Sequence, residues 1–158
     1  MNNIIKYFNR GLEIVCIFIF AFIVAVGTYQ IVTRYVFNSP STTSEELLTY
    51  SFTWLALLSA SLVFGKREHM AMTFLYDKMP EKSRRILSIV NEALVFIFAA
   101  IVLIYGGISI TKLTATQVTA SLGIPMSYVY TVVPLSGFIT AFYSVINIIK
   151  LISKGGKV

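Results

Sequence analysis

The sequence predicts an all-α integral membrane protein with four transmembrane helices in one membrane domain spanning residues 1–158. Residues from the set AVILMFWYC make up 56% of the chain, 13% of the residues are charged, and the mean hydropathy is +0.78. Soluble domains are nearer to about 45–50% apolar and about 25% charged. The apolar residues also gather into four runs of roughly 18–25 residues, a length that crosses a bilayer.

The first run covers residues 12–32 and follows Lys6 and Arg10. A basic residue before an apolar run is also typical of a cleavable signal peptide. Such a peptide has an apolar stretch of about 7–15 residues, and this run is longer. We therefore expect a membrane anchor that is retained in the protein.

The second run covers residues 46–64. Thr42 and Thr43 each precede a glutamate, Glu45 or Glu46, by three residues. This is the spacing of a capping box. In this motif a side-chain hydroxyl and a carboxylate accept hydrogen bonds from backbone N–H groups that have no partner at the start of a helix. Carboxylates there also favour the positive end of the helix dipole. Gly65 stands where a glycine C-cap is expected.

The third run covers residues 86–110, and the segment up to Val118 lacks Gly and Pro, which would let the helix extend that far. The fourth run covers residues 126–149. It follows Pro125, and proline is favoured at the start of a helix. Pro134 lies inside this run, removes one backbone hydrogen bond and is predicted to kink the helix.

Basic residues predict the orientation of the spans. Four spans place both termini on one side of the membrane, and eleven basic residues share that side: Lys6, Arg10, Lys66, Arg67, Lys78, Lys82, Arg84, Arg85, Lys150, Lys154 and Lys157. Two basic residues, Arg34 and Lys112, fall on the other side. The positive-inside rule therefore places both termini and the 65–85 connector in the cytoplasm. Because the +6 net charge flanks apolar runs, we expect no nucleic-acid partner.

The connector between the second and third runs contains a possible amphipathic helix over residues 70–79. Met72, Leu75, Tyr76 and Met79 have the i, i+3, i+4, i+7 spacing of one helix face. A short helix lying in the headgroup plane fits this pattern. An irregular loop is the alternative, because Phe74 interrupts the stripe. The residues expected at the membrane surface, in contact with lipids, are Lys66, Arg67, His69, Leu75, Arg84 and Arg85.

The inventory of reactive side chains argues against an enzyme. Cys16 is the single cysteine and His69 the single histidine, which excludes an intrachain disulfide and a multi-histidine metal site. The sequence shows no Ser-His-Asp, Cys-His or paired-carboxylate constellation. We therefore expect neither catalysis nor a cofactor.

Polar residues inside the spans are the default functional candidates, because they are costly in a bilayer. Glu92 could be a proton or cation ligand, or a polar tie to another helix or to a partner subunit. Glu13 is expected to form an interfacial pair with Arg10. Trp54 lies deeper than the interfacial belt where tryptophans gather, and Ala56 and Ala60 have the small-xxx-small spacing of close helix contacts. We expect Trp54 to pack within the bundle or against another protein.

Three stretches in this order resemble a known family. The first is Arg34-Tyr35-Val36-Phe37-Asn38-Ser39-Pro40, followed by Ser44-Glu45-Glu46-Leu47 and Trp54. The second is Lys66-Arg67-Glu68-His69, followed by an apolar segment and Pro80. The third is Leu122-Gly123-Ile124-Pro125-Met126 with Tyr128, Tyr130 and Pro134. Over residues 12–150 the chain resembles the small, DctQ-like membrane subunit of tripartite ATP-independent periplasmic (TRAP) transporters. It departs mildly from that pattern at Ser127, where an aromatic residue is more usual.

This resemblance implies a subunit of the bacterial inner membrane that scaffolds a large membrane subunit of about a dozen helices. The large subunit would carry the substrate and sodium sites. A periplasmic solute-binding protein would deliver an acidic solute such as a C4-dicarboxylate or sialic acid. The candidate interface residues toward these partners are Arg34, Glu45, Glu46, Trp54, Glu92, Pro125 and Pro134.

Two other functions remain open at this point. An autonomous four-helix transporter acting as a homo-oligomer would need a carboxylate facing a central pore, and Glu92 is the candidate for it. A membrane-anchored assembly factor without a transport partner is the third possibility.

Overall fold

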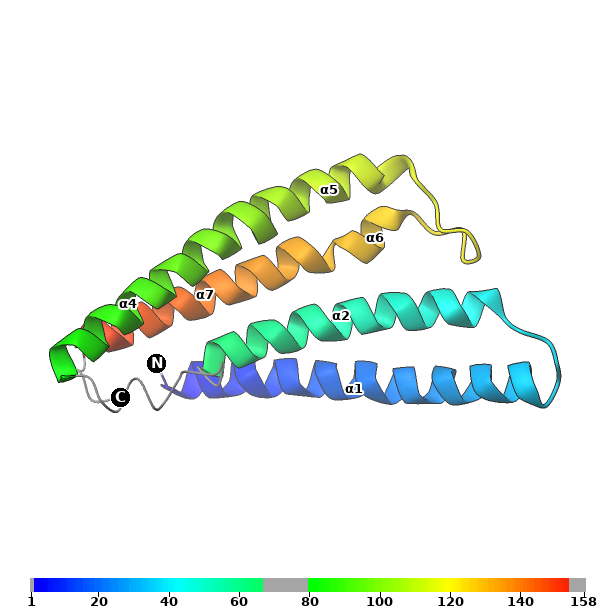
Figure 1. The fold of residues 1–158 in the computed structure, drawn as a ribbon, viewed down its shortest axis with the longest axis horizontal. Helices are drawn as coiled ribbons and strands as arrows, with labels where there is room; N and C mark the ends of the chain where they lie inside the picture. The colour runs from blue at the N-terminus through cyan, green and yellow to red at the C-terminus, as the bar shows by residue number, and fades with distance from the viewer. Residues whose placement is uncertain (1, 67–79, 154–158) are drawn as a thin grey trace. The chain divides into compact units, whose positions relative to one another are not determined.

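The computed structural model describes residues 2–66 and 80–153, and nearly all of them are helical (Figure 1). Within these ranges, four helical stretches are long and apolar enough to cross a membrane: Ile5–Tyr35, Thr42–Lys66, Ser83–Thr116 and Met126–Ser153. The part that the structure describes contains no strand, and one isolated bridge joins Val118 and Pro125. The predicted all-α class with four spans is therefore confirmed.

The four stretches are built from eight helical segments. The first two are single helices, α1 and α2, whereas the third and fourth are composite. The segments are α1 (Asn2–Tyr35), α2 (Thr42–Lys66), α4 (Glu81–Phe98), the π-helix η1 (Ala99–Gly106), α5 (Gly107–Leu113), the 3-10 helix η2 (Thr114–Thr116), α6 (Met126–Tyr130) and α7 (Val132–Ser153). The third stretch ends at Thr116, because Gln117 is already extended. The helices extend beyond the spans that hydropathy predicts. Which of their residues lie inside the membrane therefore stays a prediction.

The start of α2 differs from the expected capping box. The Ser44 backbone N–H donates to Ser41 Oγ at 3.3 Å, so Ser41 caps the helix and Thr42 is its first residue. The capping roles predicted for Thr42 and Thr43 are wrong. The helix therefore begins one or two residues earlier than the capping-box spacing predicted. This leaves the Glu46 side chain available for a distant partner.

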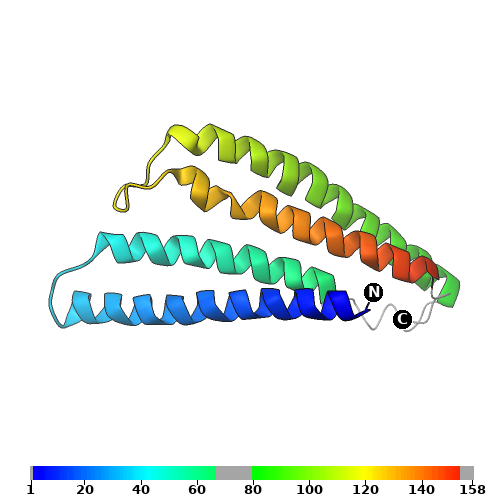
Figure 2. The same cartoon turned by 180° about the vertical axis from the view of Figure 1, so that it is seen from behind.

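The chain divides into two compact units, and the first comprises Met1–Ala60 and Ser109–Val132. Within it, α1 and α2 run antiparallel and side by side (Figures 1 and 2). The loop before α6 folds back on itself: Thr119 N–H donates to the Ile124 carbonyl, and Met126 N–H donates to the Gln117 carbonyl, both at 2.9 Å. Gly123 closes this turn with a φ of +65°, a backbone conformation that glycine adopts without steric cost.

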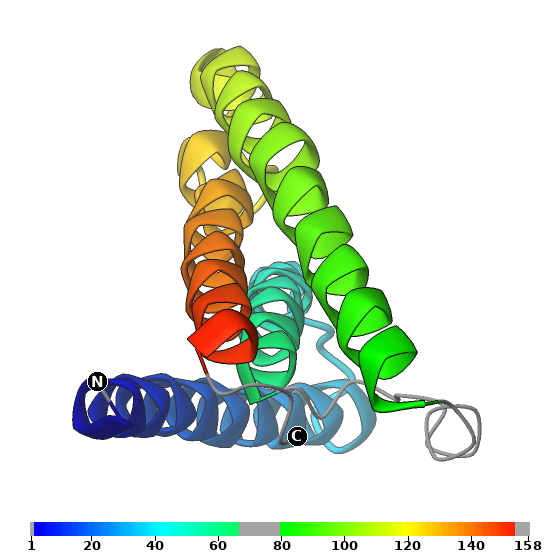
Figure 3. The same cartoon turned by 90° about the vertical axis from the view of Figure 1, so that its left-hand side faces the viewer.

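The second unit comprises Ser61–Ile108 and Val133–Val158. In it, α4 and η1 lie along α7, and Figure 3 shows the first turns of α4 and the last turns of α7 facing the viewer. A Cβ on Gly65 would lie 2.6 Å from the ring of the buried Tyr143. Gly65 is thus a close-contact residue inside α2, and the C-cap predicted for it is wrong because α2 continues to Lys66.

The fourth helical stretch is interrupted at Thr131, three residues before Pro134, where the sequence predicts a kink. Helix α6 ends at Tyr130 and α7 begins at Val132. The interruption fits the chemistry of proline, which has no N–H to donate to the carbonyl four residues earlier. A Cβ on Gly107 would lie 2.8 Å from Pro134 Cδ, so the glycine lets the third helical stretch approach the proline ring.

Candidate functional site

The carboxylate of Glu46 holds the loop that precedes α6. Its oxygens accept hydrogen bonds from three consecutive backbone amides: Ala120 at 2.9 Å, Ser121 at 3.0 Å and Leu122 at 2.9 Å. The Tyr50 hydroxyl lies 3.2 Å from Glu46 Oε1. Hydrogen bonds to an ionised acceptor are stronger than those between neutral groups. We call this arrangement the Glu46 latch; it ties α2 to the 117–125 loop within the first unit.

The neighbouring Glu45 has a different environment. Arg34 Nη1 lies 4.0 Å from Glu45 Oε1, and both side chains are more than half exposed. An exposed pair of this kind contributes about 0–1 kcal/mol to stability. Arg34, Glu45 and Glu46 were all predicted as interface residues toward the partners. The structure pairs Arg34 with Glu45 and assigns Glu46 to the latch.

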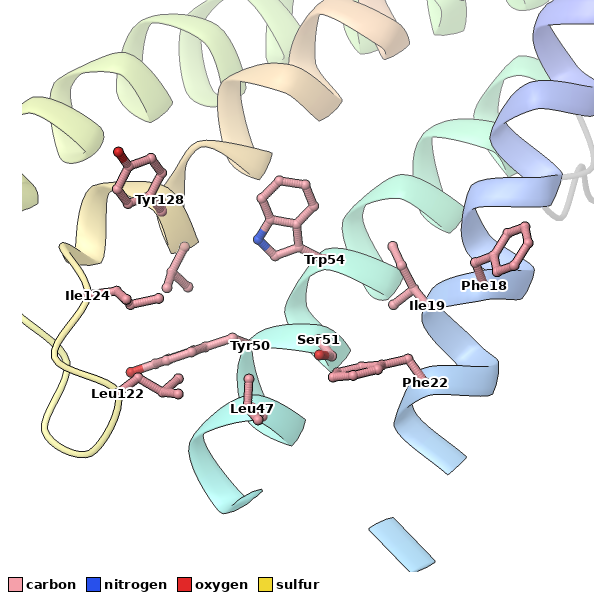
Figure 4. Close-up of a pocket in the computed structure, with 11 residues that line it drawn as sticks. Phe18, Ile19, Phe22, Leu47, Tyr50, Ser51, Trp54, Leu122, Ile124 and Tyr128 are labelled. Carbon is pink, nitrogen blue, oxygen red and sulfur yellow. The ribbon is translucent and has the colours of Figure 1, made fainter. Parts of the chain in front are cut away.

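An apolar pocket of about 450 Å³ adjoins the latch in the first unit, because Tyr50 and Leu122 line it. Trp54 lines it, which places this predicted contact residue in a concave surface (Figure 4). Pro125 directly precedes α6, whose residues Tyr128 and Val129 close one side. The other labelled lining residues are Phe18, Ile19 and Phe22 from α1, Leu47, Tyr50 and Ser51 from α2, and Leu122 and Ile124 from the loop.

A buried polar stripe runs along α7 in the second unit. Its four members are at most 4% exposed: Ser136, Thr140, Ser144 and Asn147. The Thr140 hydroxyl donates to Ser61 Oγ at 3.1 Å, and Ser61 Oγ lies 3.2 Å from the Ser136 carbonyl. Our sequence reasoning missed this stripe, although its i, i+4, i+8, i+11 spacing was a readable signal. Such residues hydrogen-bond one helix to another inside a membrane.

Glu92 on α4 joins this stripe and is 7% exposed. Its Oε2 accepts from the Ser144 hydroxyl at 3.0 Å, and its Oε1 accepts from Asn147 Nδ2 at 3.2 Å. The Ser144 hydroxyl also lies 2.8 Å from the Glu92 carbonyl oxygen. Of the two roles considered for Glu92, this geometry favours a polar tie between helices.

The residues expected at the membrane surface are only partly described. Lys66 is the last residue of α2. Arg85 Nη2 donates to the Ile152 carbonyl at 3.0 Å, so this arginine caps the end of α7. Arg84 lies beside it in the first turn of α4 and is half-buried. Arg67, His69, Leu75 and the predicted interfacial helix over residues 70–79 lie outside the described residues.

Comparison with known proteins gives a consistent assignment. The chain is 34% identical over 152 residues to the sialic acid TRAP transporter small permease protein SiaQ of Vibrio cholerae, covering 93% of this chain and 86% of that protein. It is 31% identical over 153 residues to a protein named as a TRAP transporter small permease in Haemophilus influenzae, covering 97% and 92%.

A third relative is much longer than this chain. The sialic acid TRAP transporter permease protein SiaT of Haemophilus influenzae is 30% identical over 137 residues, which are 87% of this chain but 22% of that protein. Residues 23–154 match the family described as tripartite ATP-independent periplasmic transporters, DctQ component. These relatives are transporter permeases and not enzymes. The chain therefore belongs to the DctQ component family of tripartite ATP-independent periplasmic transporters.

Proposed function

We propose that this chain scaffolds a separate large transport subunit in a three-part uptake system. The match to SiaT carries this proposal, because the part of SiaT that resembles this chain is only 22% of that permease. A region that is fused to a much larger permease in one relative is expected to lie beside an equivalent large subunit here. A periplasmic binding protein would be the third component.

The internal contacts of Glu92 support a scaffold over an autonomous carrier. A carrier built as a homo-oligomer needs a membrane carboxylate that faces a central pore. Glu92 instead lies buried within its own unit and accepts hydrogen bonds from Ser144 and Asn147. Among the described residues, no group of three or more His, Cys, Asp or Glu side chains could hold a metal ion.

The proposed solute is an organic acid, taken up with sodium. Sialic acid appears in the names of two relatives, SiaQ and SiaT, and supports an acidic substrate. A C4-dicarboxylate is the other solute class that the family resemblance suggests. We assign the solute and sodium sites to the large subunit, because this chain carries few ionisable groups inside its spans.

Surfaces for the partners follow from the exposed residues of the first unit. The exposed Arg34–Glu45 pair is available to the large subunit or to a docked binding protein. The Glu46 latch would keep the neighbouring loop in one shape for such contacts. Among the other interface candidates, Trp54 and Pro125 lie at the pocket, whereas Glu92 and Pro134 face the interior of the second unit.

Transport measurements test the scaffold role. Liposomes with a sodium gradient should take up sialic acid or a C4-dicarboxylate when they contain both membrane subunits and the binding protein. Liposomes with this chain alone should show no uptake, and the two membrane subunits should purify together. Uptake by the isolated chain would contradict the scaffold role and favour the autonomous carrier.

Membrane orientation is a second testable part of the proposal. We place this multi-pass chain in the bacterial inner membrane with both termini in the cytoplasm. Eleven of its basic residues fall on the side of the termini and two on the opposite side, and basic residues gather on the cytoplasmic side. In a Cys16→Ala background, an impermeant thiol reagent added to intact cells should label Ser39→Cys and Ser121→Cys but not Lys82→Cys. Ser39 is preferable to Asn38, whose φ of 49° disfavours cysteine. Labelling of Lys82→Cys alone would invert the proposed topology.

A further inference from the structure

The amides that bind Glu46 belong to a tight turn that has hydrogen bonds of its own. The Thr119 N–H donates to the Ile124 carbonyl at 2.9 Å, and Thr119 Oγ1 accepts from the Ile124 N–H at 3.1 Å. The Thr119 carbonyl accepts from the Gly123 N–H at 3.2 Å. Thr119 is 3% exposed, and Gly123 closes the turn with its φ of +65°. These bonds shape the turn from within, in addition to its contact with Glu46.

Three amides of this turn share one acceptor group. Consecutive backbone N–H groups in a turn form a concave site for an anion. Ala120 donates to Glu46 Oε1. Ser121 and Leu122 donate to the second oxygen, Oε2. The Tyr50 hydroxyl lies 3.2 Å from Oε1, and in Figure 4 its ring extends from α2 toward Leu122. Donors therefore contact both oxygens, an arrangement that fits a carboxylate better than it fits a single-atom anion.

The ligand and its site come from separate parts of the chain. The turn belongs to the connection between the third and fourth helical stretches, whereas Glu46 lies in the first turns of α2. Ala120 and Ser121 are exposed and Glu46 is half-buried, so small ions in solution can reach the site. Removal of the Glu46 side chain would leave the three amide donors and the internal bonds of the turn in place.

We propose that the 119–124 turn is a carboxylate-binding site in which Glu46 is the resident ligand. The turn supplies the donors, and a free carboxylate takes the place of Glu46 when that side chain is removed. In the unaltered chain Glu46 keeps the site filled, because a tethered group has a high effective concentration beside its partner. The latch is therefore a contact that an acidic group from another molecule enters only by displacing Glu46.

Chemical rescue tests this proposal on the full chain purified with its large subunit. Glu46→Ala removes from the site the heavy atoms of one acetate ion. The amides of Ala120, Ser121 and Leu122 should exchange hydrogen faster in this variant, and sodium acetate should slow their exchange again. With a dissociation constant on the order of 0.1 M, acetate at about 0.3 M should slow the exchange roughly fourfold. Sodium chloride at the same ionic strength and pH should have no such effect.

Matched variants separate a carboxylate site from a general effect of the salt. Glu45→Ala removes the neighbouring carboxylate, whose ion pair is exposed, and should leave the exchange of the three amides unchanged with and without acetate. The unaltered chain should likewise show no response to acetate. In the Glu46→Ala background, Thr119→Val removes the acceptor of the Ile124 N–H with little change in volume and should weaken the acetate response. Thr116→Val, at an exposed threonine outside the turn, should leave that response unchanged.

Several outcomes would overturn the proposal. If acetate fails to slow exchange in Glu46→Ala, or chloride slows it equally, the amides form no carboxylate site. Loss of protection at the Thr119 and Gly123 amides in the same variant would show that Glu46 itself shapes the turn.

A second measurement applies if Glu46→Ala assembles poorly. Acetate present during purification should then raise the yield of the complex above the yield in chloride, and equal yields would contradict the proposal. The carboxylate site does not depend on the scaffold role. Co-purification and solute uptake of the unaltered subunits report on that role separately, so failure of one proposal is distinguishable from failure of the other.

Discussion

Replacing Glu46 with leucine should release the 119–124 turn from α2 and destabilise the first unit. Three consecutive amides lose the ionised acceptor that they share, and hydrogen bonds to a charged acceptor are stronger than those between neutral groups. Water can replace part of that loss, because Ala120 and Ser121 are exposed. The expected loss of stability is therefore smaller than the loss of three buried hydrogen bonds would be.

Hydrogen exchange on the assembled complex measures this effect. The amides of Ala120, Ser121 and Leu122 should exchange faster in Glu46→Leu, and to a smaller extent in Glu46→Gln, which keeps one acceptor oxygen. Glu45→Gln is the matched control, because its exposed pair with Arg34 contributes little. Unchanged exchange in Glu46→Leu, or equal acceleration in Glu45→Gln, would show that the latch does not order the loop.

The sequence predicted the features of this fold that depend on composition and local chemistry. Four apolar runs were sufficient to predict four spanning helices, because hydrophobic length is read directly from sequence. The missing N–H of Pro134 predicted a disturbed last helix, and the structure has an interruption three residues earlier, at Thr131. Neither inference requires knowledge of which residues meet across the fold.

The wrong local predictions share a physical reason. Glu46 was expected to cap its own helix, yet the three backbone amides that donate to it lie more than 70 residues away in sequence. Gly65 was expected to end a helix, yet its role is to admit the Tyr143 ring. In both cases a tertiary contact decides between two uses of one residue type. The π-helix η1 has no sequence marker that we could identify.

The buried stripe on α7 illustrates a signal that can be read only in part. Its four polar residues recur at helical spacing and could have been predicted to face one side. Spacing alone leaves open whether that side meets another helix, a partner or a water-filled path. The contacts of Glu92 with Ser144 and Asn147 show that these two residues of the stripe face another helix.

These contacts make Glu92 the second residue whose replacement should have a large effect. Glu92→Leu should destabilise the assembled complex by about 1–3 kcal/mol, because the Asn147 amide is then buried without its acceptor. Glu92→Gln keeps the volume and an acceptor oxygen, so the complex should assemble and transport nearly normally. Thermal unfolding of the purified complex measures the first effect, and solute uptake measures the second.

A double variant distinguishes a polar tie from a transport role. If Glu92 and Asn147 serve each other, Glu92→Leu combined with Asn147→Leu should regain much of the stability that Glu92→Leu loses. Replacing both partners of a buried hydrogen bond by apolar groups can be nearly neutral, whereas removing one leaves the other unsatisfied. A coupling energy near zero would mean that the pair contributes no stability. A normally assembled Glu92→Gln complex without transport would instead place the carboxyl group in the transport process, and the autonomous carrier would again have to be considered.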